Sequence, residues 1–204
     1  MSVNGVVGRV LRASTRGFDC GTHSRNIDNQ HDFGAFVKAP IANNPGMYAI
    51  GLIYKIEIKD DQLISELVLG DAIPDTILRD QRANRMIPVE VKVLNIGYAS
   101  NAAIVHSLPP RPPMTLSDVT LCSPEEVNAF VECRNRALDF FRLVLGASEV
   151  PTDDLLACAI QYAARHYDEG EARYRFLVEC GRRVAQDLSN DLKRLNHILG
   201  LIHP

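Results

Sequence analysis

The sequence of 204 residues contains no tryptophan, and aromatic residues make up only 6% of it. A protein that binds single-stranded nucleic acid by base stacking needs aromatic side chains, and this chain has few to offer. None of the 13 glycines is followed by lysine. The Gly-Lys pair belongs to the phosphate-binding loop of many ATPases, so we expect no ATP hydrolysis by such a loop.

Long apolar runs and paired cysteines are absent as well. The longest uncharged segment, Val93 to Pro110, contains asparagine, glycine and prolines that a bilayer-spanning helix would not tolerate. Residues 1–17 lack the apolar run of a secretory signal. The five cysteines form an odd set without a Cys-x-x-Cys pair, which argues against a disulfide framework and a zinc ribbon. We therefore predict a cytoplasmic protein with no membrane span and no cofactor.

What is present is ordinary for a globular protein, with 46% hydrophobic residues, 23% charged residues and a formal net charge of −3. A net charge that is small and negative excludes an obvious binder of polyanions such as nucleic acids. The sharpest change in composition is Leu108-Pro-Pro-Arg-Pro-Pro113, where four prolines restrict the backbone to an extended connector. We place a domain boundary there, which divides the chain into residues 1–113 and 114–204.

Short β-branched segments separated by turn residues occupy the first domain, a pattern typical of strands. The best strand candidates are residues 3–13, 33–39, 47–58 and 88–98. Apolar and charged residues alternate strictly in Tyr54 to Lys59 and in Val89 to Val93, so each strand should have one buried and one exposed face. The pattern predicts a small closed antiparallel barrel. Asp71 to Arg85 interrupts it, and we interpret this segment as a short inserted helix.

The spacing changes to that of helices after the boundary. Ser123-Pro-Glu-Glu126 has the arrangement of a capping box, so a helix should begin at Pro124 and end near Gly146. A second helix is predicted from Thr152 to about His166. A third should run from about Glu171 to Leu199, where apolar residues recur every three or four positions. The expected fold class is α+β, a small antiparallel β-barrel followed by a C-terminal three-helix domain.

Several segments of the first domain together resemble the HAS-barrel family, which is named for the HerA-type ATPases and the ATP synthase. They are Gly8 to Thr15, Phe33 to Lys38, Ile50 to Tyr54, Pro88 to Val91, Ile96 to Tyr98 and Leu108 to Pro113. The resemblance covers residues 1–113 and implies a six-stranded barrel. In HerA-type proteins that barrel helps to assemble the ring and to dock a nuclease partner. The helical half resembles the tail of stand-alone members that lack the ATPase domain.

Side chains that can bind metal gather between Asp19 and Asp32. Cys20, His23, His31 and Asp32 are weak candidates for ligands, because Cys-x2-His-x7-His matches no strong metal-binding pattern. The interpretation that we favour is a barrel loop, since aspartate, asparagine and histidine are common in turns. A metal-dependent enzyme that uses residues 19–32 is one alternative function.

Another alternative is nucleic-acid binding by the barrel, as an accessory factor of DNA processing. It would use a basic patch formed where the first strand and the inserted helix meet. The arginines available for such a patch are Arg9, Arg12, Arg16, Arg79, Arg82 and Arg85. The interpretation that we favour is that these side chains cover the barrel surface or contact a protein.

The sequence thus predicts a non-enzymatic assembly or adaptor protein that acts through protein-protein contacts of the barrel and the helices. No Gly-x-Ser-x-Gly or His-Glu-x-x-His motif indicates catalysis. Apolar residues continue to the end of the third helix, beyond the reach of the two shorter ones, so we expect a homo-oligomer, a dimer, formed through this helix. The alternative is that the end of this helix folds back on the barrel and buries the same leucines within one chain. The interface candidates are Leu192, Leu195, Ile198, Leu199 and Ile202.

Overall fold

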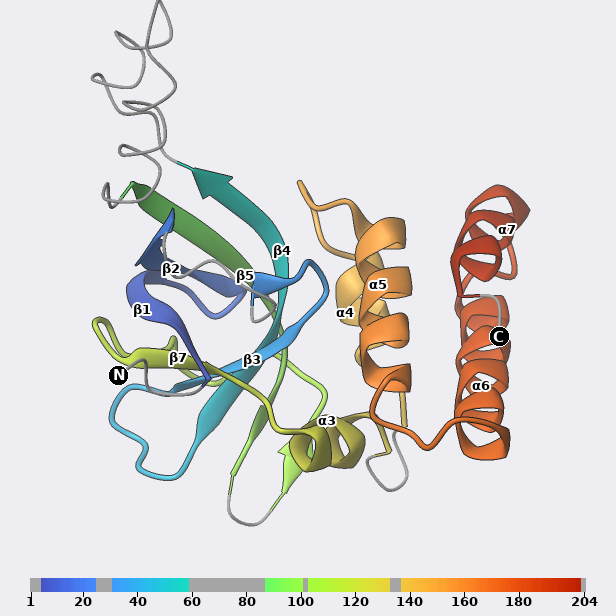
Figure 1. The fold of residues 1–204 in the computed structure, drawn as a ribbon, viewed down its shortest axis with the longest axis horizontal. Helices are drawn as coiled ribbons and strands as arrows, with labels where there is room; N and C mark the ends of the chain where they lie inside the picture. The colour runs from blue at the N-terminus through green and yellow to red at the C-terminus, as the bar shows by residue number, and fades with distance from the viewer. Residues whose placement is uncertain (1–4, 25–30, 59–86, 101–102, 133–136, 203–204) are drawn as a thin grey trace, which may run out of the picture.

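The structure is a computed structural model that describes residues 5–24, 31–58, 87–100, 103–132 and 137–202. In this part of the chain six antiparallel strands close into a barrel in the order β2-β1-β7-β3-β4-β5, and β5 pairs with β2 to complete the ring (Figure 1). The strands are β1 (Val6–Ala13), β2 (Gly17–His23), β3 (Phe36–Pro40), β4 (Tyr48–Ile58), β5 (Pro88–Ala99) and β7 (Asp118–Leu121). A short strand, β6 (Ile104–Val105), pairs with the end of β5. The predicted closed antiparallel barrel is confirmed.

Small apolar side chains from alternate strand positions fill the barrel interior. On β5, Val89, Val91 and Val93 belong to this interior cluster and are at most 2% exposed. Lys92, between two of them, lies on the outer face and is only partly buried. The alternation of β5 therefore places its valines as the sequence predicts.

A capping box starts the first helix that follows the barrel. The Glu126 carboxylate accepts a hydrogen bond from the Ser123 amide at 2.8 Å, and Ser123 Oγ accepts one from the Glu126 amide at 3.3 Å. These two bonds satisfy amide groups that the first turn of a helix leaves without partners. The predicted helix start at Pro124 is confirmed.

This helix does not continue to Gly146, so the prediction of one long helix is wrong. The structure has α3 (Pro124–Val131) and a separate short helix, α4 (Phe141–Leu145). Leu138, just before α4, adopts a φ of 62°, which a continuous right-handed helix excludes. The change of direction allows Phe140 and Phe141 to be buried together with Leu138 itself.

The predicted third helix is also interrupted, as α6 (Glu171–Asp187) and α7 (Leu192–Leu201). Asp191 starts α7 by accepting a hydrogen bond from the Arg194 amide at 3.2 Å, and the Ser-Asn-Asp sequence before Leu192 favours a turn. α7 folds back along α6, so that a Cβ at Gly181 would lie 3.4 Å from the Leu199 side chain. The prediction of one helix from Glu171 to Leu199 is therefore wrong.

The second predicted helix is present as α5 (Thr152–Ala164), which lies between the barrel and the α6–α7 pair (Figure 1). Gly34 permits its close approach to the barrel, because a Cβ there would lie only 2.8 Å from Cys158 Cβ. Gly34 also has a φ of 84°, a conformation that glycine adopts without strain. In place of the expected three helices, the described part of the chain after the barrel contains five, α3 to α7.

A second apolar core joins the outer wall of the barrel to the helices. Phe36 on β3 belongs to this core, whereas the adjacent Val37 belongs to the barrel interior. The ring of Phe36 lies 6.1 Å from the ring of Phe130 on α3 and 6.1 Å from the ring of Phe140, measured between centroids. The barrel and the helices therefore share one aromatic cluster.

The proline-rich segment packs along the barrel instead of leaving it. Pro113 forms an isolated bridge with Ile41, and the amide of Met114 donates to the carbonyl of Pro40 at 2.9 Å. The strand that follows, β7, pairs with both β1 and β3. The barrel thus continues past the boundary predicted at Pro113 and ends at Leu121.

One predicted element, the inserted helix at Asp71 to Arg85, lies outside the described residues. The helices that the structure does describe include none with the length and apolar character needed to cross a bilayer.

Candidate functional site

The predicted metal candidates are distributed over different faces of the barrel. Asp19, Cys20 and His23 lie on strand β2, not in a loop. Successive strand residues face opposite sides, so Cys20 enters the barrel interior while Asp19 contacts Arg12 outside. Burial raises the pKa of the Cys20 thiol to about 12, which disfavours the thiolate that a metal would need.

His31 and Asp32 have other partners. His31 is buried, and its Nε2 donates to the carbonyl oxygen of Val7 at 2.9 Å. Asp32 lies 3.6 Å from the guanidinium of Arg165, at the end of α5. Within the described ranges, no three histidine, cysteine, aspartate or glutamate side chains converge as metal ligands would.

Two of the predicted patch arginines form ion pairs on the barrel. Arg9 Nε lies 3.0 Å from Asp118, and Arg12 Nε lies 2.6 Å from Asp19 while its other end contacts Glu90. These carboxylates neutralise positive charge that phosphate groups would otherwise contact. Arg16 lies in the exposed turn between β1 and β2. The remaining candidates, Arg79, Arg82 and Arg85, lie outside the described residues.

The five C-terminal interface candidates differ in burial. Ile198 and Ile202 are 0% and 2% exposed, in the core shared with the other helices. Leu195 and Leu199 are half-buried against the same core. Leu192 is 66% exposed. The fold-back of α7 therefore covers most of the apolar side that a continuous helix would have left open.

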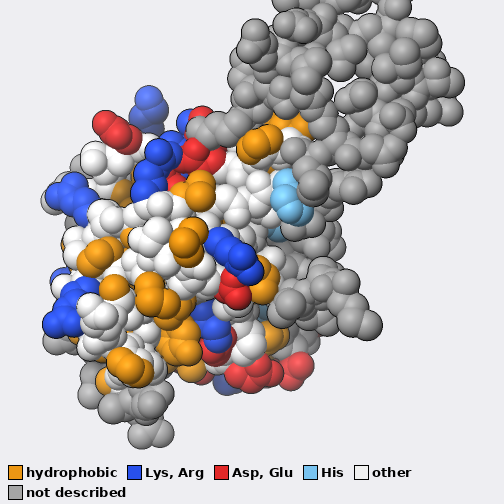
Figure 2. Space-filling view, turned by 90° about the vertical axis from the view of Figure 1, so that its left-hand side faces the viewer, with side chains coloured by type: hydrophobic (Ala, Val, Ile, Leu, Met, Phe, Trp, Pro, Cys, Tyr) orange, Lys and Arg blue, Asp and Glu red, His pale blue; other side chains and the backbone are white. Residues whose placement is uncertain are grey.

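An exposed apolar surface on the barrel had not been predicted from the sequence. It consists of Leu11 on β1 and of Met114 and Leu116 in the turn before β7, which are 52%, 49% and 72% exposed. We call these three residues the Leu116 face. Figure 2 shows apolar side chains among basic ones on the side of the molecule that carries β1 and β7.

Backbone hydrogen bonds hold the Leu116 face in place. The Leu116 amide donates to the Val10 carbonyl at 2.9 Å, which brings Leu116 next to Leu11. Ser117 Oγ donates to the Met114 carbonyl at 2.6 Å and closes the turn. Leu116 itself has a φ of 62°, a conformation that costs a leucine about 1–2 kcal/mol. The chain thus holds this side chain outward in a strained conformation.

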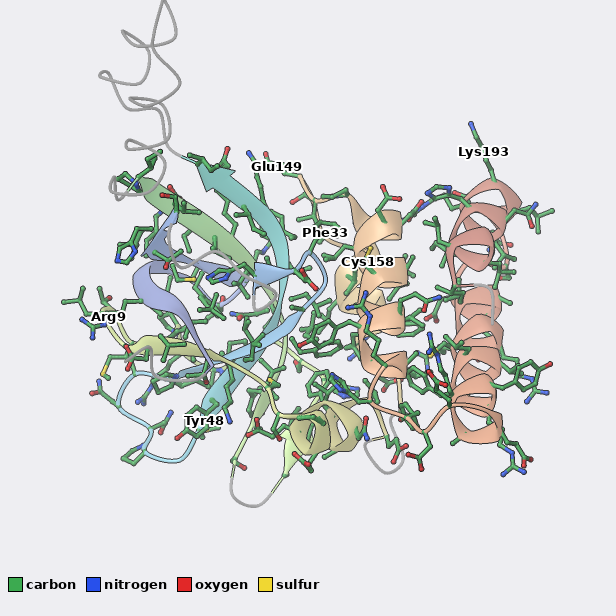
Figure 3. All side chains as sticks on the ribbon, in the orientation of Figure 1. Arg9, Phe33, Tyr48, Glu149, Cys158 and Lys193 are labelled. Carbon is green, nitrogen blue, oxygen red and sulfur yellow. The ribbon has the colours of Figure 1, made fainter. Side chains whose placement is uncertain are left out.

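The Leu116 face is on the opposite side of the barrel from the helices. Arg9 and Asp118, which are paired in the register of β1 and β7, border it, and Figure 3 shows Arg9 on the side away from α5, α6 and α7. The helices cover one wall of the barrel, and this opposite wall retains large aliphatic side chains beside an exposed ion pair. Such a surface offers apolar area and charge, the two components of protein interfaces.

Sequence reasoning missed this face because neither leucine belongs to a pattern that indicates exposure. Leu11 lies within an apolar strand, and Leu116 follows the proline-rich segment. Comparison with known proteins adds no family: no family model matches the chain, and no curated protein matches it either.

Proposed function

We propose that this chain is a non-enzymatic assembly or adaptor protein that binds another protein through the Leu116 face of its barrel. The observation that carries the proposal is the exposure of three large aliphatic side chains on one rigid surface. Covering a leucine or methionine side chain contributes about 1.5–3 kcal/mol, so three of them provide a substantial part of a protein interface.

The geometry of the barrel supports contact through side chains. A closed barrel has no free strand edge, so a partner cannot bind by adding a strand to the ring. The turn that carries Met114 and Leu116 is held by hydrogen bonds to Pro40 and Val10. A surface that is rigid before binding loses little conformational entropy when the partner binds.

The resemblance to the HAS-barrel family agrees with this proposal. In HerA-type proteins the barrel joins proteins together, and residues 1–113 of this chain carry the segments of the resemblance. The part of the chain that follows holds helices and no phosphate-binding Gly-Lys pair. Under the proposal, the helices pack against one wall of the barrel and the partner binds the opposite wall.

Site-specific photocrosslinking in native cells tests the proposal. Replacement of Leu116 by the photocrosslinker benzoylphenylalanine should give one discrete conjugate with a partner, and the added substitutions Leu11→Ser and Met114→Ser should abolish it. Tyr174 is 56% exposed on α6, far along the chain from this face, so the same probe at position 174 is the matched control. Absence of a conjugate from position 116, or the same conjugate from position 174, would contradict the proposal.

The dimer expected from the sequence belongs to the same proposal, with a second copy contacting the outer side of α7. Leu192 remains 66% exposed there, and the half-buried Leu199, seven residues further along, lies on nearly the same face. Light scattering at about 50 μM should give the mass of a dimer, and a Leu192→Asp variant should give that of a folded monomer. Leu201→Asp is the matched control, because Leu201 is 45% exposed and lies on the opposite face of the same helix. A monomeric parent would exclude this dimer.

A further inference from the structure

A pocket of about 520 Å³ lies between one end of the barrel and the segment from α4 to α5. The β1–β2 turn around Arg16 forms one side, and residues 142–150 form the other. Its volume falls within the range of small-molecule sites, about 300–1,000 Å³. It is separate from the Leu116 face, because none of Leu11, Met114 and Leu116 lines it.

The interior of the pocket is largely apolar. Leu94 contributes a half-buried side chain from the barrel, and Leu108 beside it is 38% exposed. Leu143 and Val150 line the opposite side. An apolar molecule or group of moderate size would displace water from these surfaces.

Two of the three arginines that line the pocket lack an acidic partner in the part of the chain that the structure describes. Neither Arg16 nor Arg142 lies within ion-pair distance of a carboxylate among the residues that the structure describes. Arg12, the third lining arginine, already contacts Asp19 and Glu90. The pocket therefore combines an apolar interior with two guanidinium groups whose charge no described carboxylate neutralises.

The backbone that carries Arg16 is firmly held. Ser14 Oγ accepts hydrogen bonds from the amides of Arg16 and Gly17 at 3.1 and 3.2 Å. The buried Asn95 side chain donates to the Thr15 carbonyl at 3.0 Å, and the Asn95 amide donates to the Arg16 carbonyl at 2.9 Å. On the other side, Arg142 Nη2 lies 3.5 Å from the His106 carbonyl oxygen. These contacts fix the backbone of Arg16 and restrain the Arg142 side chain.

We propose that this pocket binds a small amphipathic organic anion. The apolar body of the ligand lies against Leu94, Leu143 and Val150, and its carboxylate or phosphate group contacts Arg16 and Arg142. Guanidinium groups bind both anions through paired, charge-assisted hydrogen bonds. This binding is additional to the proposed adaptor function and does not depend on it.

Two dyes that differ by one charged group test the proposal on the full chain. 8-Anilinonaphthalene-1-sulfonate carries a sulfonate, whereas N-phenyl-1-naphthylamine has the same ring system without it. An Arg16→Gln, Arg142→Gln variant should weaken binding of the anionic dye at least tenfold and leave binding of the neutral dye unchanged. Arg182→Gln, at an exposed position on α6, is the matched control and should change neither.

Two further variants locate the dyes. Ala147→Trp places a large ring in the pocket and should reduce binding of both dyes at least tenfold, with the circular dichroism of the folded chain retained. Leu116→Ser should leave both affinities unchanged, because that residue lies on the other surface. Equal binding of the anionic dye to the parent and the double arginine variant would overturn the proposal. The proposal would also be overturned if Ala147→Trp did not reduce the binding of the two dyes.

Competition identifies the anionic group. Decanoate and decyl phosphate have the same apolar chain and differ in their anionic group. Displacement of the anionic dye by decanoate indicates a carboxylate ligand, and displacement by decyl phosphate indicates a phosphate ligand. Decanol is the uncharged control and should displace the dye at least tenfold less well than the effective anion. Failure of both anions to displace the dye would overturn the proposed ligand class.

Discussion

The barrel interior and the core beneath the helices are built from different side chains. Valines and alanines dominate the interior, as in Val7, Val37 and Val119, with Phe18 as its one buried phenylalanine among the described residues. The outer core contains the other four buried phenylalanines of that part of the chain, which are Phe36, Phe130, Phe140 and Phe141. The inside of a six-stranded barrel is narrow, whereas helices can be spaced to admit rings. The larger side chains therefore lie where the barrel and the helices meet, and this contact should contribute most to the stability of the whole chain.

The largest effect should come from Phe130→Ala. Its ring contacts those of Phe36, Phe140 and His106, so truncation leaves a cavity in the shared core and should cost about 3–5 kcal/mol of unfolding free energy. Urea unfolding followed by far-UV circular dichroism and tyrosine fluorescence measures the loss. Both signals should also change in a single transition. Two separate transitions would mean that the barrel and the helices do not share a core.

A smaller loss of unfolding free energy is expected from a substitution inside the barrel. Val91→Ala removes two methyl groups from a fully buried position and should cost about 2 kcal/mol, measured in the same urea titrations. Lys92→Ala, at the adjacent outward position, is the control and should change stability by no more than about 0.5 kcal/mol. A Val91→Ala loss as large as that of Phe130→Ala would reverse the comparison between the two cores.

An ion pair between two helices should contribute less and depend on pH. Arg194 on α7 donates hydrogen bonds to Asp153 on α5 at 2.9 and 3.0 Å, and these bonds lower the pKa of Asp153 below its usual 3.8. Because the pKa is lower in the folded chain, the pair stabilises it above pH 3.8, and this stabilisation is lost as pH falls through the folded pKa. Asp153→Asn should therefore cost about 1 kcal/mol near pH 7 and progressively less as pH falls below 3.8.

Stability measured from pH 7 down to about pH 2 checks this, with Asp154→Asn as the control. The Asp154 side chain is 57% exposed and its ion-pair partner, His197, is also exposed, so its replacement should have little effect. An Asp153→Asn loss that stays constant over this range would exclude the ion pair as its cause.

The smallest effect has the opposite sign. Leu116→Gly relieves the strain of a leucine at a φ of 62°, and after allowance for the greater freedom of glycine in the unfolded chain it should stabilise the barrel by about 0.5–1 kcal/mol. Met114→Gly, at a position without a positive φ, should destabilise it slightly. Thermal unfolding of the two variants distinguishes these outcomes. A loss of stability in Leu116→Gly would mean that the leucine packs within its own chain, which would weaken the docking proposal.

Much of the barrel could be predicted because its strands have strong local patterns. The alternation in β5 identifies the strand and its inward face, whereas in β4 it identifies only the strand. Tyr54 packs against the helical core and Ile56 against the barrel interior, because the register of β4 shifts between Ile53 and Lys55. β2 was not predicted, since its sequence Gly-Phe-Asp-Cys-Gly-Thr-His has little β propensity. Its strand conformation depends on pairing with β1 on one side and β5 on the other. This pairing also explains why the residues from Asp19 to His23 alternate between two faces.

The ends of the helices were harder to predict than their starts. The capping box formed by Ser123 and Glu126 involves only the first turn of α3, so four residues of sequence are enough to recognise it. In contrast, apolar residues at helical spacing continue past Val131 and Leu188, where α3 and α6 stop. The chain reverses at these points because the segments that follow bury more apolar surface by folding back onto α5 and the barrel. The candidate pocket depends on the same folding back, since it brings Arg142 opposite Arg16.

By itself, the sequence determined the α+β composition, four of the barrel strands and the start of α3, because alternation and capping act between residues a few positions apart. Only the tertiary structure decided that Ile198 is buried, that Leu116 is exposed and that two distant arginines line one pocket. These properties depend on which surfaces cover one another. Contacts between residues far apart in the chain set them, and no local pattern encodes such contacts.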